Sequence, residues 1–222
     1  MGFFDSAPKP AAAASRPFRF VLIIGSPGMG KSALAEELQI AWTKERKGRG
    51  VIAVLDPARQ FRHLGDAVAS WPGEKDPDDD RSPEQRAEAW LKAFKRTRVG
   101  RDDSPPALVI LDDADTYMGA GSPRGVWRDF LMTFRHWRAD VMMLGRRTQE
   151  LPKVAVSNCS SVAIFFSSEP YYKEYIRAWL GSAVVKAIPL VPHQYILVDT
   201  STKEFTLHTT KKRANLTAAD LS

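Results

Sequence analysis

Short apolar runs recur along the chain, and each one stops at a glycine, a polar residue or an acid. Continuous apolar runs of this length are typical of strands buried on both faces, as in a parallel sheet. The runs that we interpret as strands are Phe18–Ile24, Val51–Leu55, Ala107–Leu111, Val141–Leu144 and Val162–Phe166.

The segments between these runs carry apolar residues at helical spacing. Strands that alternate with helices predict an α/β fold with a mostly parallel central sheet flanked by helices. A polar turn between Gln194–Val198 and Phe205–His208 predicts a C-terminal β-hairpin. The predicted helices are Ser32–Lys47, Glu84–Arg98 after Pro83, Gly125–Trp137 and Tyr171–Leu180.

The length of 222 residues suits one domain with a full core. We expect this domain at 18–210, after a flexible leader at 1–17 rich in Ala, Pro and Ser, and before a tail at 211–222. No apolar run approaches the roughly 20 residues of a membrane span. The single cysteine, Cys159, rules out an internal disulfide and fits the cytoplasm.

The net charge of +6 bears on which partners the chain can bind. A basic balance of this size permits binding to nucleic acid or to another anionic surface. A solvated surface with excess lysine and arginine explains the same number equally well.

The turn after the first strand fits the phosphate-loop pattern Gly-x4-Gly-Lys-Ser at every fixed position, between a strand and a helix. Its glycines let backbone N–H groups turn toward phosphates, and the helix N-terminus adds positive potential. We expect Lys31 to reach the β- and γ-phosphates of ATP, and Ser32 to bind Mg²⁺. The predicted nucleotide-binding loop is Gly25, Ser26, Pro27, Gly28, Met29, Gly30, Lys31 and Ser32.

The third strand ends in two acids, Asp112 and Asp113. Open α/β sheets place their sites at the carboxyl ends of the strands. Downstream of a phosphate loop, Asp112 is the candidate for the Mg²⁺ shell and Asp113 for polarising the attacking water. Together the two motifs predict a P-loop ATPase that uses ATP and Mg²⁺.

Two further segments resemble the FtsK/HerA group of DNA-pumping ATPases. Val51–Phe61 is similar to that group's second strand and its "Asp-Pro-x-x-Gln/Glu-aromatic" end, and Phe134–Gln149 is similar to its fourth-strand block. The resemblance covers roughly Phe20 to Leu207. Asp56, within the first segment, fits either a position near the nucleotide or a turn before proline.

The resemblance implies roles for two more residues. Gln149 matches the family's polar sensor of the γ-phosphate, and Arg138 matches the arginine finger that reaches a neighbouring subunit's nucleotide. A finger supplied in trans implies a homo-oligomer, and a hexameric ring is expected. Capping of a helix by Arg138 and a backbone bond from Gln149 are the alternatives. Arg135, Arg146 and Arg147 are other candidates for the finger.

The chain departs from the family at the second acid. Many members have glutamate where this chain has Asp113, which is one methylene shorter. This leaves open whether Asp113, Asp115 or another group is the catalytic base.

A compact core of this kind is similar to the genome-packaging ATPases of membrane-containing icosahedral phages. The resemblance implies an ATP-driven translocase of double-stranded DNA, indifferent to sequence. Such a motor works in the host cytoplasm and in association with the virion, with capsid vertex proteins as partners. The loop Thr116–Gly125 fits either a DNA-contacting loop or a plain connector.

The segment Arg135–Asp140 also resembles the phage assembly ATPases similar to zonula occludens toxin. Those proteins usually carry a membrane anchor after the ATPase core, and none is evident here. The alternative function is therefore an assembly or secretion ATPase that acts on protein and not on DNA. A small-molecule kinase is disfavoured because no lid or acceptor-site motif is evident.

Overall fold

The computed structural model describes residues 19–57, 61, 68–71, 80–100, 104–118 and 125–210. The expected leader at 1–17 and the expected tail at 211–222 lie outside these residues, as do positions 119–124 of the candidate DNA-contacting loop. Within the described part of the chain, no helix has both the length and the apolar character needed to cross a bilayer.

The described residues form an eight-stranded sheet in the order β3-β2-β4-β5-β1-β6-β7-β8. The strands from β3 to β6 in this order are parallel, and β7 and β8 are added antiparallel as a C-terminal hairpin. This arrangement confirms the predicted fold class. The strands are β1 Phe20–Ile24, β2 Val51–Leu55, β3 Val68–Trp71, β4 Ala107–Leu111, β5 Ala139–Gly145, β6 Ser161–Ile164, β7 Gln194–Asp199 and β8 Phe205–Thr209.

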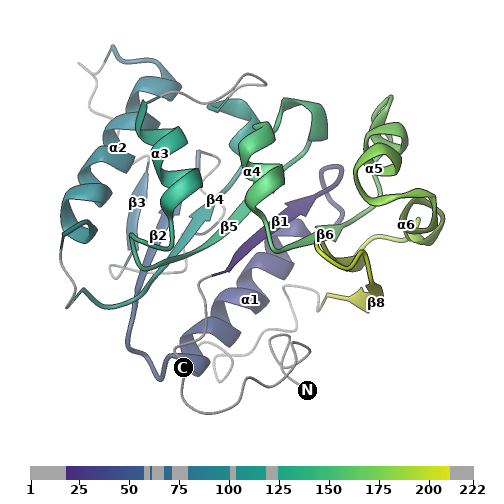
Figure 1. Ribbon diagram of the computed structural model, residues 1–222, viewed down its shortest axis with the longest axis horizontal. Coiled ribbons are helices and arrows are strands. Elements are labelled where there is room, and N and C mark those ends of the chain that lie inside the picture. The colour runs from purple at the N-terminus through teal and green to yellow at the C-terminus, as the bar shows by residue number, and fades with distance from the viewer. Residues whose placement is uncertain are drawn as a thin grey trace.

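Helices cover both faces of the sheet, which explains why its central strands are apolar throughout. In β1, Phe20 and Leu22 pack into one core, while Val21 and Ile23 pack into the other. Figure 1 shows α2, α3 and α4 on one side of the sheet and α1 on the other. The helices are α1 Lys31–Glu45, α2 Pro83–Arg98, α3 Gly125–Thr133, α4 Lys153–Asn158, α5 Tyr172–Leu180 and α6 Ser182–Ala187.

Three elements were not predicted from the sequence: β3, α4 and α6. Each is four to six residues long, which is too short for either periodicity to be read. The helix predicted to end at Trp137 ends at Thr133, because residues 134–138 form turns that lead into β5. Arg138 closes this segment with φ 53°.

The position of β5 decides which residues meet at the carboxyl edge of the sheet. β5 lies between β1 and β4, with Ile24 beside Gly145 and Leu111 beside Met143. The phosphate-loop turn, the residues after β5 and the acids after β4 therefore emerge next to one another.

A buried acid ties the far end of α1 to the opposite edge of the sheet. The Asp140 carboxylate accepts hydrogen bonds from the Arg19 backbone N–H at 2.7 Å and from the Trp42 indole Nε1–H at 2.6 Å. It also pairs with the Arg46 guanidinium at 3.2 Å. α1 is thus held at its C-terminal end by these contacts, while its N-terminal end faces the phosphate loop.

Asp140→Ala should lower the free energy of unfolding by about 3 kcal/mol, because it removes the acceptor of a buried indole N–H and of a backbone N–H, and the carboxylate paired with Arg46. Urea unfolding followed by circular dichroism measures this loss. The matched control is Asp129→Ala, whose carboxylate pairs with Lys95 where both side chains are about two-fifths exposed. The control should lose less than about 1 kcal/mol. Equal losses in the two variants would contradict the anchoring role of Asp140.

Candidate nucleotide-binding site

The turn between β1 and α1 requires glycine at two places. Gly25 has φ 149°, and a Cβ there would lie 2.6 Å from the Cβ of Phe165. Gly30 has φ 106°, and a Cβ there would lie 2.9 Å from Nδ1 of His193. Because side chains are excluded at these points, the turn stays narrow and its backbone N–H groups are accessible to an anion.

Lys31 begins α1, and its ammonium group points back into this loop. Nζ donates hydrogen bonds to the carbonyl oxygens of Gly25 at 2.9 Å and Ser26 at 3.1 Å. Burial lowers the pKa of this lysine, and the negative charges of Asp113 and Asp112 oppose that shift. A buried cation on the loop fits the predicted contact of Lys31 with phosphates.

A cavity of about 310 Å³ brings most of the predicted site residues together. It is open to solvent along the loop, and both predicted motifs line it. His193, which precedes β7, and Arg146, which follows β5, join them. The lining residues are Pro27, Gly28, Gly30, Lys31, Ser32, Ala33, Asp112, Asp113, Arg146 and His193.

Asp112 follows β4 directly and is buried. Its Oδ2 atom is buried without a hydrogen-bond partner. Burial raises the pKa of this carboxyl to about 7, and the neighbouring charges of Asp113 and Asp56 add to the shift. Asp56 is also a turn residue, because its Oδ2 accepts the Phe61 backbone N–H at 2.7 Å. The turn interpretation of Asp56 is therefore seen in the structure, and its position near the nucleotide stays a prediction.

A buried carboxylate oxygen without a donor is suited to a cation. Mg²⁺ keeps several waters and binds proteins through one or two carboxylates together with substrate phosphates, so it needs no cage of acids. Accordingly, no three His, Cys, Asp or Glu side chains converge to hold a metal among the described residues. Asp112 and the Ser32 hydroxyl fit a magnesium ion that arrives with a nucleotide, and their role as its ligands stays a prediction.

Asp113, the predicted partner of the attacking water, is bound to an arginine. Its backbone is left-handed at φ 47°, and its Oδ1 lies 3.3 Å from Nε of Arg146. The same Nε lies 4.0 Å from Oδ2 of Asp115, whose Oδ1 accepts the Arg146 backbone N–H at 3.3 Å. Burial raises the pKa of Asp113, and the Arg146 charge opposes the rise.

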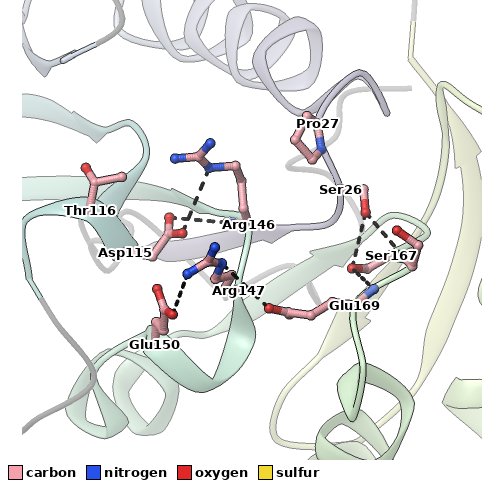
Figure 2. Close-up of a pocket in the computed structure, with 10 residues that line it drawn as sticks. Ser26, Pro27, Asp115, Thr116, Arg146, Arg147, Glu150, Ser167 and Glu169 are labelled. Carbon is pink, nitrogen blue, oxygen red and sulfur yellow. Dashed lines mark hydrogen bonds and ion pairs between the residues drawn. The ribbon is translucent and has the colours of Figure 1, made fainter.

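A second cavity, of about 430 Å³, adjoins the first where Pro27 and Arg146 line both. Figure 2 shows Arg146 directed toward Asp115, and Arg147 held between Glu150 and Glu169. Ser26 of the phosphate loop contributes to this cavity. Both cavities lie at the carboxyl edge of the sheet.

The structure does not bring Gln149 into either cavity. It is exposed in the short 3₁₀ helix Thr148–Glu150, where its Oε1 accepts the Thr148 hydroxyl at 3.2 Å. Arg146, the first residue after β5, is the one that reaches the acids. The sensor role of Gln149 stays a prediction that this geometry does not support.

Arg138 lies at the opposite edge of the sheet. Its carbonyl oxygen accepts the backbone N–H of Ala107, the first residue of β4, at 2.9 Å. Strands rise about 3.3 Å per residue, so Asp112 at the other end of β4 is about 16 Å away. Arg138 therefore does not act on its own chain's nucleotide, as a finger supplied in trans requires. The trans role itself stays a prediction.

Sequence reasoning missed two residues at this site. Arg146 was considered only as an alternative finger, although its place directly after an inner parallel strand is a usable signal. His193 gave no signal, because it comes from the distant β7 end of the chain. Its backbone N–H bonds the Met29 carbonyl at 2.8 Å, and its Nδ1 lies 3.0 Å from Oγ1 of Thr210.

No family model matches the sequence, and no curated protein does. Solved structures do match. The genome packaging NTPase B204 from Sulfolobus turreted icosahedral virus 2, in complex with AMPPCP, matches with a TM-score of 0.65 at 16% identity, over 89% of this chain and 100% of that chain. B204, the DNA-packaging ATPase from Sulfolobus Turreted Icosahedral Virus, matches with a TM-score of 0.67 at 15% identity, over 88% and 99% of the two chains.

A third match is Thermomonospora curvata EccC (ATPases 2 and 3) in complex with a signal sequence peptide. Its TM-score is 0.59 at 13% identity, over 88% of this chain and 37% of that chain. At these identities the matches report on the fold. Together with the phosphate loop after β1, they show that this chain has a P-loop NTPase fold.

The clustered acids make a testable prediction about stability. The pKa of Asp112 is higher in the folded chain than its ordinary value of 3.8, so stability falls as the pH rises from about 4 to about 7. Asp112→Asn should therefore stabilise the nucleotide-free protein at pH 8, by up to about 4 kcal/mol at about 1.4 kcal/mol per pKa unit. At pH 4 the gain should vanish. Urea unfolding in EDTA at both pH values measures it.

The matched control is Asp199→Asn, which should act in the opposite direction. Hydrogen bonds from Ser201 and Thr202 lower the pKa of Asp199, so its charge stabilises the fold at pH 8. If Asp112→Asn destabilised the protein at pH 8 as the control does, the ionised Asp112 carboxylate would not destabilise the folded chain.

Proposed function

We propose that this chain is a Mg²⁺-dependent ATPase that moves double-stranded DNA, as one subunit of a viral genome-packaging ring. One observation carries the ATPase part of the proposal. Lys31, Ser32, Asp112 and Asp113 come from two separate motifs and line a single cavity on a P-loop NTPase fold.

In the proposed reaction, the loop N–H groups and Lys31 bind the β- and γ-phosphates. Asp112 and Ser32 would hold Mg²⁺, which neutralises charge on the phosphates when it is bound. Asp113 takes the proton of a water whose oxygen attacks the γ-phosphorus. The bond from that phosphorus to the β–γ bridging oxygen breaks, and ADP and phosphate leave.

DNA as the substrate of the motion is supported by the B204 packaging NTPases, which this chain matches over their whole length. The net charge of +6 agrees with a polyanionic partner. A motor that travels along DNA contacts phosphates and not base edges, so it is indifferent to sequence. In this proposal the chain works in the host cytoplasm, at a capsid vertex.

A head-to-tail ring is supported by the distribution of charge. Basic residues gather at the amino edge of the sheet, while at the carboxyl edge beside the phosphate loop the acids outnumber the cations Lys31, Arg146 and Arg147. Contact between unlike faces generates rings when the rotation closes, and it would carry Arg138 of one subunit toward the nucleotide of the next. The basic residues are Lys44, Arg46, Lys47, Arg49, Arg96, Arg98, Arg135 and Arg138, and the acids are Asp113, Asp115, Glu150 and Glu169.

The match to EccC, in complex with a signal sequence peptide, favours a second candidate. In that alternative the same ATPase core acts on protein during assembly or secretion and does not hold DNA. The two candidates share the nucleotide site and differ in the polymer that stimulates it.

Double-stranded DNA should stimulate ATP hydrolysis, and Lys31→Ala should abolish it because it removes the cation from the phosphates. Phosphate release with and without DNA measures both effects. The affinity for DNA should fall steeply as the salt concentration rises. The logarithm of the binding constant should fall by about 0.9 per phosphate contact for each tenfold rise in salt, and the affinity should differ little between unrelated sequences. Lys186→Ala, on an exposed lysine of α6, is the matched control for Lys31→Ala and should retain turnover.

Hydrolysis at a normal rate in folded Lys31→Ala would refute the nucleotide site. Hydrolysis without DNA stimulation or DNA binding at low salt would instead favour the protein-handling alternative.

Arg138→Ala should bind ATP normally and fail to hydrolyse it, because the transition-state charge is stabilised from the next subunit. Mixing it with Lys31→Ala should restore part of the activity, since some interfaces then combine an intact loop with an intact finger. Phosphate release by the mixture measures the rescue, after native mass spectrometry has shown that subunits exchange. If both variants are inactive alone and their mixture stays inactive although subunits exchange, Arg138 is not the trans finger. Arg135 is then the next candidate.

A further inference from the structure

The ion pair between Arg146 and Asp113 poses a problem for hydrolysis. Asp113 is the acid placed to take a proton from water, yet its Oδ1 lies 3.3 Å from Nε of Arg146. A carboxylate that is paired with a guanidinium has one oxygen occupied by that cation. In this state Arg146 and an attacking water compete for Asp113.

The same arginine is positioned to meet a nucleotide. Arg146 lines the cavity that contains Lys31 and Ser32, and its charge lowers the pKa of Lys31, which places the two cations close together. Its side chain is 40% exposed, so the guanidinium can move within the cavity at little cost in packing. A γ-phosphate bound at Lys31 would therefore lie in a cavity that Arg146 also lines.

The backbone of Arg146 is fixed while its side chain is not. Its N–H donates to Oδ1 of Asp115 at 3.3 Å, and Asp115 is buried. Asp115 thus holds residue 146 at the end of β5 whichever partner the guanidinium has. With the backbone of Arg146 held in place, its guanidinium can leave one anionic partner and pair with another.

We propose that Arg146 positions Asp113 in response to the γ-phosphate. It holds Asp113 in the nucleotide-free site and releases the acid when the γ-phosphate of ATP takes over the guanidinium. ADP lacks that group, so it leaves the Arg146–Asp113 pair in place. This inference rests on the proposed ATPase function and adds to it a device within one subunit that couples the base to the presence of ATP.

Arg146→Ala should weaken binding of AMPPCP about tenfold and leave ADP binding within about twofold of the parent, because only AMPPCP carries a γ-phosphate. Isothermal titration with Mg²⁺ measures both affinities. Arg146→Lys should recover part of the AMPPCP affinity. The matched control is Arg128→Ala, on an exposed arginine of α3 that lines neither cavity, which should not change the ratio of the two affinities.

A double-mutant cycle tests the release of Asp113 itself. Asp113→Asn should tighten AMPPCP binding at least about threefold, since the guanidinium no longer has to leave a carboxylate. In Arg146→Ala/Asp113→Asn that gain should disappear, and ADP binding should show no such coupling. Binding of ADP also reports that each variant is folded.

The outcomes separate the inference from the function on which it rests. If the parent binds neither AMPPCP nor ADP, the ATPase proposal fails. If the parent binds both, and Arg146→Ala weakens them equally or the gain from Asp113→Asn persists without Arg146, the site stands and the switch is excluded.

Discussion

Parallel pairing places the carboxyl ends of β1, β5 and β4 at one edge of the sheet, and the site depends on this constraint. Strands of similar length in register leave their following residues side by side, whatever their distance in sequence. Lys31 of the loop and the acids after β4 therefore meet across the end of β5. A residue at the other end of a strand, such as Arg138, is excluded from the same site by the length of that strand.

Bringing these charged groups together in a buried site lowers the stability of the folded chain, and the rest of the fold must offset this loss. Asp112 has a raised pKa, and Lys31 has a lowered one, because burial disfavours the charged form of each group. The pKa of the buried Tyr117 is raised well above its ordinary value by burial and by the charge of the acids. The two apolar cores and the Asp140 anchor on α1 supply stability at positions away from this strain.

The sequence was informative where one segment determines its own structure. The phosphate loop, the acids after β4 and the alternation of strands and helices could be recognised because each is local. β3, α4 and α6 are too short to carry a periodicity. Arg146 and His193 act through neighbours from other elements, so only the folded chain reveals their contacts. Gln149 is matched to the sensor by family resemblance alone, and in the structure it is exposed in the short 3₁₀ helix after β5.

The hairpin β7–β8 has a consequence for the order in which the molecule can be completed. The phosphate loop is contacted by His193 through Met29 and Gly30, and His193 is in turn bonded to Thr210. Gly30 and Thr210 are 180 positions apart (30 to 210). The ribosome therefore synthesises the loop long before it synthesises His193 and Thr210, which hold the loop in place. Contacts of such long range form late and slow folding, so a nascent chain carries an unbraced loop until almost the whole domain has been synthesised.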